Sequence, residues 1–594
     1  MSIGSLRRVI YRYSLFMLLL LILGVFMIWP IILTVRGGFM DEDGSFTLYY
    51  LTSVFRNPVM IEGLIHSITI AICTTFLCLV LTMPLAMLAA RYHFMGKTVV
   101  TGLIMVPLIL PPFVGAIGFR ALLGRFGALH SLLVSLGAVA PDQPIDILGG
   151  SWLPQMPPFN LVDGRLVCIV LLEALHLYPI LYLNITAALA NLDPTLKEAA
   201  EGVGAGRWRR FWRITMPLAM PGIFAGATIV FIWSFTELGT PLMLDYYTVT
   251  PVQIFWGIYE VRSNPQPYAL VVVMFAVALV LYLVSKLTIG RGTVTMQGRA
   301  AIAAQPKRLS FPISLGVLAL FGGLIGLAVL PHIGVIFSSL SASGSWYRSV
   351  LPEIFTLDHF EKALSHELTT DSIRNSLVYA SLATTLCLVI GVSISYLTVR
   401  LKVKGGWLLD GLAMLPLAVP GLVMAFGYVA LTLNWPFGQG NPLGHWASVV
   451  GTNPNPVPLL VIAYAVRRLP YVVRSVSAGL EQTSGEMEEA ALNLGASTIR
   501  VLRRIVIPLI MANLIVGAIL AFSFSMLEVS DSLILAQQQK YYPVTKAIYE
   551  LFGRLGDGPY IAAALGVWGM ALLTVTLVGS AALMGKRLGA IFRV

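Results

Sequence analysis

Long runs of apolar residues divide this sequence, and they limit its possible folds more than any other feature. Each run holds about 20 residues, the length that a helix needs to cross the hydrocarbon core of a bilayer. Only 11% of the 594 residues are charged, whereas soluble domains carry about 25%. We therefore predict an all-α, polytopic membrane protein with about 12 transmembrane helices. The runs cover residues 14–35, 64–90, 99–119, 166–190, 217–241, 268–289, 312–339, 375–399, 407–433, 457–480, 508–535 and 560–585.

Two other apolar features need a separate interpretation. Residues 121–139 form a stretch that is short for a span and begins next to Arg120, so we interpret it as interfacial or re-entrant. The first run is longer than a signal-peptide core and no small-residue cleavage site follows it, so we expect an uncleaved span. The four cysteines lie inside apolar runs without a CxxC pair, so neither a metal site nor a disulfide framework is predicted.

The basic residues indicate the orientation of the chain. Lys and Arg favour cytoplasmic loops, and most of them fall in short alternate loops if the N-terminus is inside. Both termini are then cytoplasmic. The net charge of +11 could also attract nucleic acid, but no basic stripe with interleaved aromatic residues occurs. We expect membrane lipid as a partner and not nucleic acid.

An internal repeat divides the chain into two halves. At an offset of 309 residues, Ser67 aligns with Ser376 and Arg91 with Arg400, and at an offset of 291, Glu237 aligns with Glu528. Because the halves run in the same direction through the membrane, we expect a pseudo-twofold axis along its normal and a path between them. The predicted divisions are a first module at 1–289, a cytoplasmic linker at 290–311 and a second module at 312–594.

One short motif occurs twice, in the cytoplasmic loop between the fourth and fifth runs of each half. Its two alanines give a thin helix face that allows close approach, and its glycine permits a sharp turn. In the second copy, Thr483 and Glu486 have capping-box spacing. The alternative is an amphipathic helix that packs only on its own bundle. The motif residues are Glu198, Ala199, Ala200 and Gly204 in the first half, and Glu489, Ala490, Ala491 and Gly495 in the second.

The motif resembles the EAA signature of permeases of binding-protein-dependent ABC importers, in which Ile-x-Leu-Pro follows the glycine. Both copies keep the isoleucine and the proline, and Met216 and Ile507 replace the leucine. Over its whole length the chain is similar to permeases in which two such domains are fused, as in the ferric-iron transporter type. The resemblance implies two parallel six-helix repeats of the type I ABC permease fold.

The resemblance also implies partners and a location. In the family this helix docks in a cleft of the ATPase subunit, so the eight motif residues are the predicted ATPase-coupling residues. We expect a cytoplasmic ABC ATPase dimer, a periplasmic or extracellular solute-binding protein, and residence in the bacterial inner membrane. No GxxxxGK[ST] phosphate loop occurs in the sequence. We therefore expect no cofactor and no enzymatic activity in this chain, with ATP bound by the partner subunit.

Ionisable and helix-breaking residues inside the spans are candidates for the translocation path. Such ionisable residues usually face the bundle interior, and prolines free backbone carbonyls that can face a cavity. Salt bridges between helices and tolerated kinks are equally acceptable interpretations, and no metal site is predicted. The candidates are Glu173, His176, Pro179, Glu237, Arg467, Arg468, Pro470, Glu528 and Asp531.

The identity of the solute stays open at this stage. Ferric iron, free or chelated, is favoured by analogy with the fused permeases, and polyamine, thiamine and phosphonate permeases share the signature. Arg467 and Arg468 would suit an anionic solute or chelate as well as structural pairing. Two rivals from other classes are a secondary transporter driven by an ion gradient, and a membrane scaffold that transports nothing.

Overall fold

The computed structural model describes residues 3–584 apart from Glu42, Leu110, 144–163, Asn191, Asp193, 290–306, Gln439 and Thr452. The described residues are helical almost throughout, as predicted, and their one sheet is a two-residue parallel pairing of β1 (Tyr92–His93) with β2 (Lys307–Arg308). Most of the predicted linker, residues 290–306, lies outside the described residues.

The helices of the first half include several short pieces between the long ones. They are α1 (Ile3–Leu23), η1 (Gly24–Ile28), α2 (Trp29–Gly38), α3 (Tyr49–Val54), α4 (Pro58–Arg91), α5 (Lys97–Leu103), η2 (Val106–Ile109), α6 (Pro112–Leu123), α7 (Ala128–Ser135), α8 (Gly164–Ala190), α9 (Pro194–Gly202), α10 (Arg207–Arg210), η3 (Phe211–Thr215), α11 (Met216–Phe235), α12 (Gly239–Met243), α13 (Thr250–Gly257), η4 (Ile258–Glu260) and α14 (Gln266–Ile289).

The second half repeats this order. Its helices are α15 (Phe311–Leu340), α16 (Asp358–Ser365), α17 (Glu367–Ser395), η5 (Tyr396–Arg400), α18 (Gly406–Met414), η6 (Leu415–Leu417), α19 (Gly421–Leu433), α20 (Val457–Glu481), α21 (Glu486–Asn493), α22 (Thr498–Val501), η7 (Leu502–Val506), α23 (Ile507–Leu509), α24 (Met511–Met526), α25 (Ser530–Leu535), η8 (Gln539–Tyr541), α26 (Val544–Phe552) and α27 (Gly558–Met584).

The spans agree with the predicted runs in number and differ in continuity. Nine described helices are long and apolar enough to cross a membrane, and two bent helix pairs raise the number to 11. The remaining predicted run corresponds to α20, which has 25 residues but carries Arg467, Arg468 and Arg474. The candidate span Pro112–Ser135 includes α7, which lies in the stretch that we interpreted as interfacial or re-entrant.

Four predicted runs are broken helices, and the run at 217–241 is one of them, because α11 ends at Phe235 and α12 starts at Gly239. The run at 99–119 is divided into α5, η2 and α6 around Pro107 and Pro111, and the run at 407–433 bends by 106° between Leu417 and Gly421. Proline removes a backbone donor and clashes with the preceding turn, so the helix ends there. The run at 508–535 is wrong as a single helix, because α24 ends at Met526 and α25 starts at Ser530.

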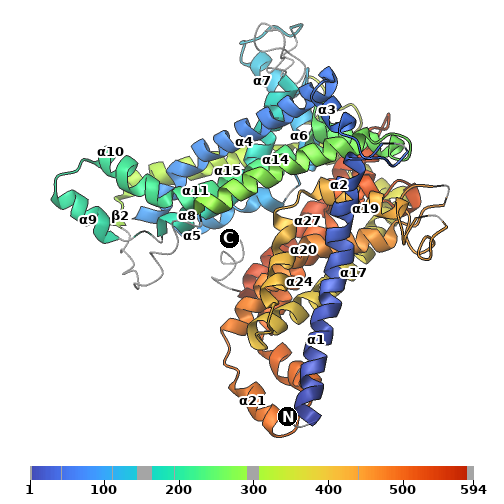
Figure 1. Cartoon of the computed structure of the whole chain (residues 1–594). Helices are drawn as coiled ribbons and strands as arrows, with labels where there is room; N and C mark the ends of the chain where they lie inside the picture. The colour runs from blue at the N-terminus through green and yellow to red at the C-terminus, as the bar shows by residue number, and fades with distance from the viewer. Residues whose placement is uncertain are drawn as a thin grey trace.

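The two halves form two diverging bundles (Figure 1). Helices α4, α8 and α11 pack on one another in the first half, and their repeat equivalents α17, α20 and α24 do so in the second. The short helix α9 lies at the free end of the first bundle and α21 at the free end of the second. The repeat predicted from the sequence is therefore present as two copies of one helical core.

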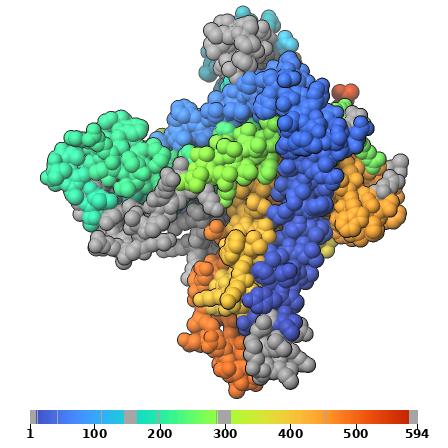
Figure 2. Space-filling view, viewed as in Figure 1, coloured from blue at the N-terminus to red at the C-terminus, as the bar shows by residue number. Residues whose placement is uncertain are grey.

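The first span of each half packs against the other half. Helix α2 of the first half packs on α19 of the second half, and α15 of the second half packs on α6 of the first half. Figure 2 shows the N-terminal helices lying along the surface of the second half. Both crossings are close because a glycine meets a proline: a Cβ added at Gly118 would lie 2.0 Å from the carbonyl oxygen of Pro331, and one at Gly427 would lie 2.9 Å from Cβ of Pro30.

The bundles also contact each other at the end remote from α9 and α21. There α13 and α26 occupy equivalent places, because the backbone amide of Thr250 donates to Ser67 Oγ at 2.9 Å and that of Val544 donates to Ser376 Oγ at 2.8 Å. The rings of Phe255 in α13 and Tyr549 in α26 meet edge to face with centroids 6.2 Å apart. Equivalent elements in mutual contact place the pseudo-twofold axis at this point.

The Gly118 crossing gives a test of the helix exchange. We expect Gly118→Val to lower the melting temperature of the detergent-purified protein, because overpacking a tight contact costs about 1–3 kcal/mol. The matched control is Gly323→Ala in α15, where an added Cβ has no atom within 4 Å and alanine favours the helix. An unchanged melting temperature for Gly118→Val would contradict the crossing.

Candidate functional site

A cavity of about 270 Å³ lies between the two bundles. Both halves line it, and seven of the nine predicted path residues are in its wall. The prolines that break the third span of each half border it as well. The seven residues are Glu173, His176, Glu237, Arg467, Arg468, Pro470 and Glu528, and the bordering prolines are Pro111, Pro112, Pro416 and Pro420.

Breaks in the fifth spans place two of the carboxylates. Glu237 lies between α11, which ends at Phe235, and α12, which starts at Gly239. Glu528 lies between α24 and α25 in the same way. Non-helical backbone is tolerated at membrane depth where it lines a cavity or is buried in protein. The sequence comparison aligned these two glutamates, and the structure gives them equivalent positions at helix breaks.

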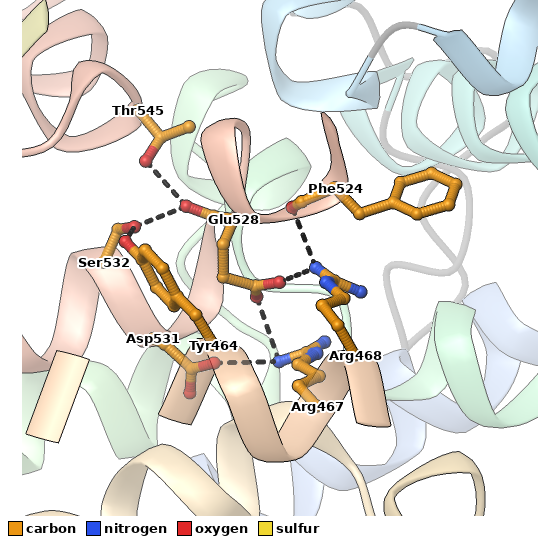
Figure 3. A network of polar contacts seen from close by, with 8 residues as sticks. All are labelled: Tyr464, Arg467, Arg468, Phe524, Glu528, Asp531, Ser532 and Thr545. Atoms are coloured by element: carbon orange, nitrogen blue, oxygen red, sulfur yellow. Dashed lines mark hydrogen bonds and ion pairs between the residues drawn. The ribbon is translucent and has the colours of Figure 1, made fainter. Parts of the chain in front are cut away.

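A network of charged groups forms the wall of the second half (Figure 3). The guanidinium groups of Arg467 and Arg468 come from adjacent positions on α20 and both reach Glu528. Arg467 Nη1 lies 3.0 Å from Glu528 Oε1 and 3.7 Å from Asp531 Oδ2, and Arg468 forms an ion pair with the other oxygen of Glu528. Arg468 also donates to the Phe524 carbonyl oxygen at 3.0 Å.

The network favours the structural interpretation of the arginines. Two guanidinium groups face two carboxylates, so the charges balance within this wall, and the arginines are structurally paired. Hydrogen bonds hold the segment around Glu528 from behind, because Thr545 Oγ1 donates to its carbonyl oxygen at 2.7 Å and Tyr464 Oη lies 2.6 Å from Ser532 Oγ. A buried pair needs this support, since its desolvation cost can exceed the attraction.

The wall of the first half is also acidic and contains no such pairing among the described residues. Ser234 donates to Glu173 Oε2, while Glu173 Oε1 is buried and makes no hydrogen bond. The backbone amide and hydroxyl of Thr240 lie 3.3 and 3.4 Å from Glu237 Oε1. His176 Nδ1 lies 2.8 Å from the Pro107 carbonyl oxygen, which the broken third span has released.

Two predicted path residues lie outside the cavity wall. Pro179 is buried within α8, and Asp531 lies behind Arg467 and contacts it. Sequence reasoning missed Ser234, whose hydroxyl bonds to Oε2 of Glu173, and Thr240, whose hydroxyl lies 3.4 Å from Oε1 of Glu237. It also missed Gly421, over which the Arg467 guanidinium lies, because a Cβ there would be 1.6 Å from Nη1. The signal for Gly421 was its place directly after the helix-breaking Pro420.

The two motif copies form short helices that project from the ends of the bundles. Helix α9 with α10 makes a lobe that stands clear of the main body (Figure 2). Ala199 is exposed in α9, and Glu489 and Ala490 are exposed in α21. The side chain of Glu198 is outside the described residues. Ala200 and Ala491 are half-buried.

A glycine with a positive φ ends each projecting segment. Gly204 has φ of 74° and Gly495 has φ of 85°, which is the left-handed conformation that glycine adopts at low cost. The residue before each glycine is apolar and unusually exposed, at 84% for Val203 and 89% for Leu494. Each turn therefore presents an apolar side chain to the surroundings at the same place in both halves.

Different ion pairs hold the two helices. In the first half Arg210 Nη1 lies 2.8 Å from Glu201 Oε2, and in the second Arg400 Nε lies 2.9 Å from the buried Glu488 Oε1. The capping-box interpretation of Thr483 is wrong, because α21 is preceded by Gly485 without a side-chain cap. Thr483 Oγ1 instead accepts from Arg400 Nη2 at 2.6 Å, and so helps to fix the start of the projecting segment.

Among the described residues, no group of three or more His, Cys, Asp or Glu side chains could hold a metal ion. Two features of the described chain occur in equivalent places in both halves: the wall of the cavity and the projecting helices. The cavity lies between the bundles and the projecting helices lie at their free ends.

Comparison with known proteins gives the family of this architecture. The family described as "Binding-protein-dependent transport system inner membrane component" matches residues 82–290 and 387–582. These two matches cover more than half of the chain and fall one in each half. They include both projecting helices and most of the cavity wall.

Three relatives name two different solutes, iron and molybdenum. The chain is 26% identical over 528 residues to the ferric transport system permease protein FbpB of Actinobacillus pleuropneumoniae, covering 87% of this chain and 69% of the relative. It is 23% identical to the Fe(3+)-transport system permease protein FbpB 2 of Haemophilus influenzae, covering 86% and 87%. It is 33% identical to the molybdenum transport system permease protein ModB of that organism, covering 30% and 68%.

The charge network predicts unequal effects of one substitution at equivalent positions. Glu528→Gln leaves two arginines with one remaining carboxylate, and breaking a buried pair costs about 3–5 kcal/mol. We expect a clear fall in melting temperature in detergent. The matched control is Glu237→Gln, where no arginine contact is lost and we expect a much smaller change. Equal shifts for both variants would contradict the pairing.

Proposed function

Because the chain belongs to the inner membrane components of binding-protein-dependent transport systems, we propose that it is the fused permease of an ATP-driven importer of ferric iron. The observation that carries this proposal is the pair of projecting helices, one at the free end of each bundle. A membrane path formed by the chain alone would not need two such helices in equivalent places.

We infer that α9 and α21 are the docking elements for a cytoplasmic ATPase dimer, one protomer for each helix. Val203 and Leu494 are exposed apolar residues. Covering their side chains with a partner would bury apolar surface and so favour docking. Glu489 and the alanines beside it give a narrow helix face that a cleft can receive. The chain carries no phosphate-loop motif, so ATP binding is assigned to the partner and no cofactor to this chain.

The proposed transport cycle follows from the diverging bundles. In the described conformation α9 and α21 are far apart, while α13 and α26 are in contact at the other end. When ATP closes the ATPase dimer, the two docked helices approach each other. The bundles then rotate about the glycine crossings, the contact between Phe255 and Tyr549 opens, and the cavity becomes accessible from outside.

The orientation follows from the same assignment. The N-terminal end of α1 lies beside α21 (Figure 1), so docking of a cytoplasmic ATPase places the N-terminus in the cytoplasm. We extend this to the C-terminus, whose last residues are outside the described part of the chain. The connections at the α13 and α26 end would then receive a periplasmic or extracellular solute-binding protein.

Ferric iron is the solute that the relatives favour. The two ferric permeases match over most of their own length and most of this chain, whereas the molybdenum permease matches about a third of the chain. Polyamine, thiamine and phosphonate remain alternatives. A secondary transporter driven by an ion gradient is the rival of another class, and it predicts uptake without any ATPase partner.

Docking through the exposed turns can be tested with two charge substitutions. We expect Val203→Asp and Leu494→Asp to abolish copurification of the ATPase and solute-dependent ATP hydrolysis, because each places a carboxylate in an apolar contact. The melting temperature of the permease should not change, since both side chains are exposed. The matched control for copurification of the ATPase is Leu555→Asp, a similarly exposed apolar residue next to α26.

The outcomes separate the proposal from its rival. Loss of the ATPase in both variants, with retention in the control, supports docking at the two turns. Uptake that proceeds in all variants without an ATPase would establish the secondary transporter instead. Retention of the ATPase in the double variant would overturn the assigned docking surface.

A further inference from the structure

We propose that Glu173 and Glu237 form a transit site for a cationic solute on the wall contributed by the first half. The inference rests on the proposed importer function and adds the charge class of the solute and the residues that hold it. Both carboxylates line the cavity and are close enough to interact electrostatically.

The two walls differ at equivalent positions, which is the first step of the argument. At the offset of 291 residues Glu237 corresponds to Glu528, so each half has a carboxylate at the break in its fifth span. The two arginines that neutralise Glu528 correspond to His176 and Leu177 in the first half. Both halves therefore have a glutamate at this position, but only the second half has the two arginines that pair with it.

A second carboxylate adds to this difference. Glu173 corresponds to Tyr464, whose hydroxyl bonds to Ser532 in the second half. The first wall thus has two carboxylates where the second has one carboxylate and one tyrosine. Arg467 is within electrostatic range of Glu237, but it forms its ion pairs with Glu528 and Asp531.

The side of the cavity that the first half forms is consequently the acidic one. Arg467 and Arg468 are matched by Glu528 and Asp531, which leaves Glu173 and Glu237 without a matching cation among the described lining residues. The third arginine of the wall, Arg474, is exposed and contacts Met414. An unneutralised pair of carboxylates attracts cations and repels oxyanions at this depth, where charges are poorly screened.

Glu173 supplies an independent observation that points to a ligand. Its side chain is 1% exposed, and Oε1 has no hydrogen bond of ordinary geometry with a described residue; the Thr74 hydroxyl interacts with this carboxyl only weakly. Burying a carboxylate oxygen without a partner is costly, and an ionisable residue inside a membrane protein marks a transport pathway more often than not. A cation arriving in the cavity would satisfy this oxygen.

The donor chemistry defines the kind of cation. Glu173, Glu237 and the neighbouring Thr236 offer hard oxygen atoms, which hard metal cations prefer. Two carboxylates are too few for a resident metal site, in keeping with the absence of a cluster among the described residues. A transit site must bind its solute weakly, because the solute must leave as readily as it enters.

Terbium luminescence provides a direct test with the full-length chain in detergent. Tb³⁺ is a hard trivalent cation that emits when a nearby tryptophan transfers energy to it, and Trp233 lines the cavity. We expect sensitised emission from the unmodified protein. We expect affinity to fall at least tenfold in Glu173→Gln and in Glu237→Gln, and binding to be lost in the double variant.

Two further variants locate the site. Trp233→Phe should remove most of the emission while Tb³⁺ still binds in an equilibrium dialysis measurement. Glu353→Gln, which alters a carboxylate outside the cavity wall, should leave both affinity and emission unchanged. Unchanged affinity in the double glutamine variant, or unchanged emission in Trp233→Phe, would overturn the proposal.

Competition then identifies the solute class. Displacement of Tb³⁺ by ferric citrate, beyond that caused by the same concentration of citrate alone, supports a metal cation, and displacement by spermidine supports an organic cation. Displacement by neither would overturn the transit role. These results are distinguishable from failure of the importer function, because the glutamine variants should retain the ATPase, whereas the Val203 and Leu494 variants lose it without losing Tb³⁺.

Discussion

The close crossing of a glycine with a proline, made once in each half, is the contact on which the rest of this structure depends. Gly118 meets Pro331 and Gly427 meets Pro30 at distances that no larger residue allows. Because each crossing joins the first helix of one half to the third span of the other, the two halves interlock. The bundles can therefore diverge toward α9 and α21 while they stay connected at the opposite end.

The same crossings leave the centre of the molecule open for polar groups. Lipid allows a broken helix only where protein or a cavity covers the freed backbone, and here the breaks at the prolines and at Glu237 and Glu528 all border one cavity. The acidic positions at the breaks are equivalent in the two halves. The surroundings of the two positions differ, because the arginines of α20 form ion pairs with Glu528 and not with Glu237.

The sequence predicted the architecture and most of the charged residues that line the cavity, but not the partners of those residues. Apolar runs, basic loops and repeated glycines and prolines predicted the spans and the two halves, because these features act through local chemistry. The pairing of Arg467 with Glu528 joins residues 61 positions apart across a helix break, and no spacing rule specifies it. The capping box at Thr483 failed for a similar reason: a distant side chain, Arg400, bonds to this hydroxyl.

The unlike walls of the cavity explain why a single chain has an advantage over two separate subunits. Two copies of the first half would place four carboxylates without cations around one space, and two copies of the second would leave none. Because the first span of each half packs on the other half, two separate first halves, or two separate second halves, could still interlock. Covalent fusion removes both mispaired assemblies and guarantees one acidic and one neutral wall in every complex.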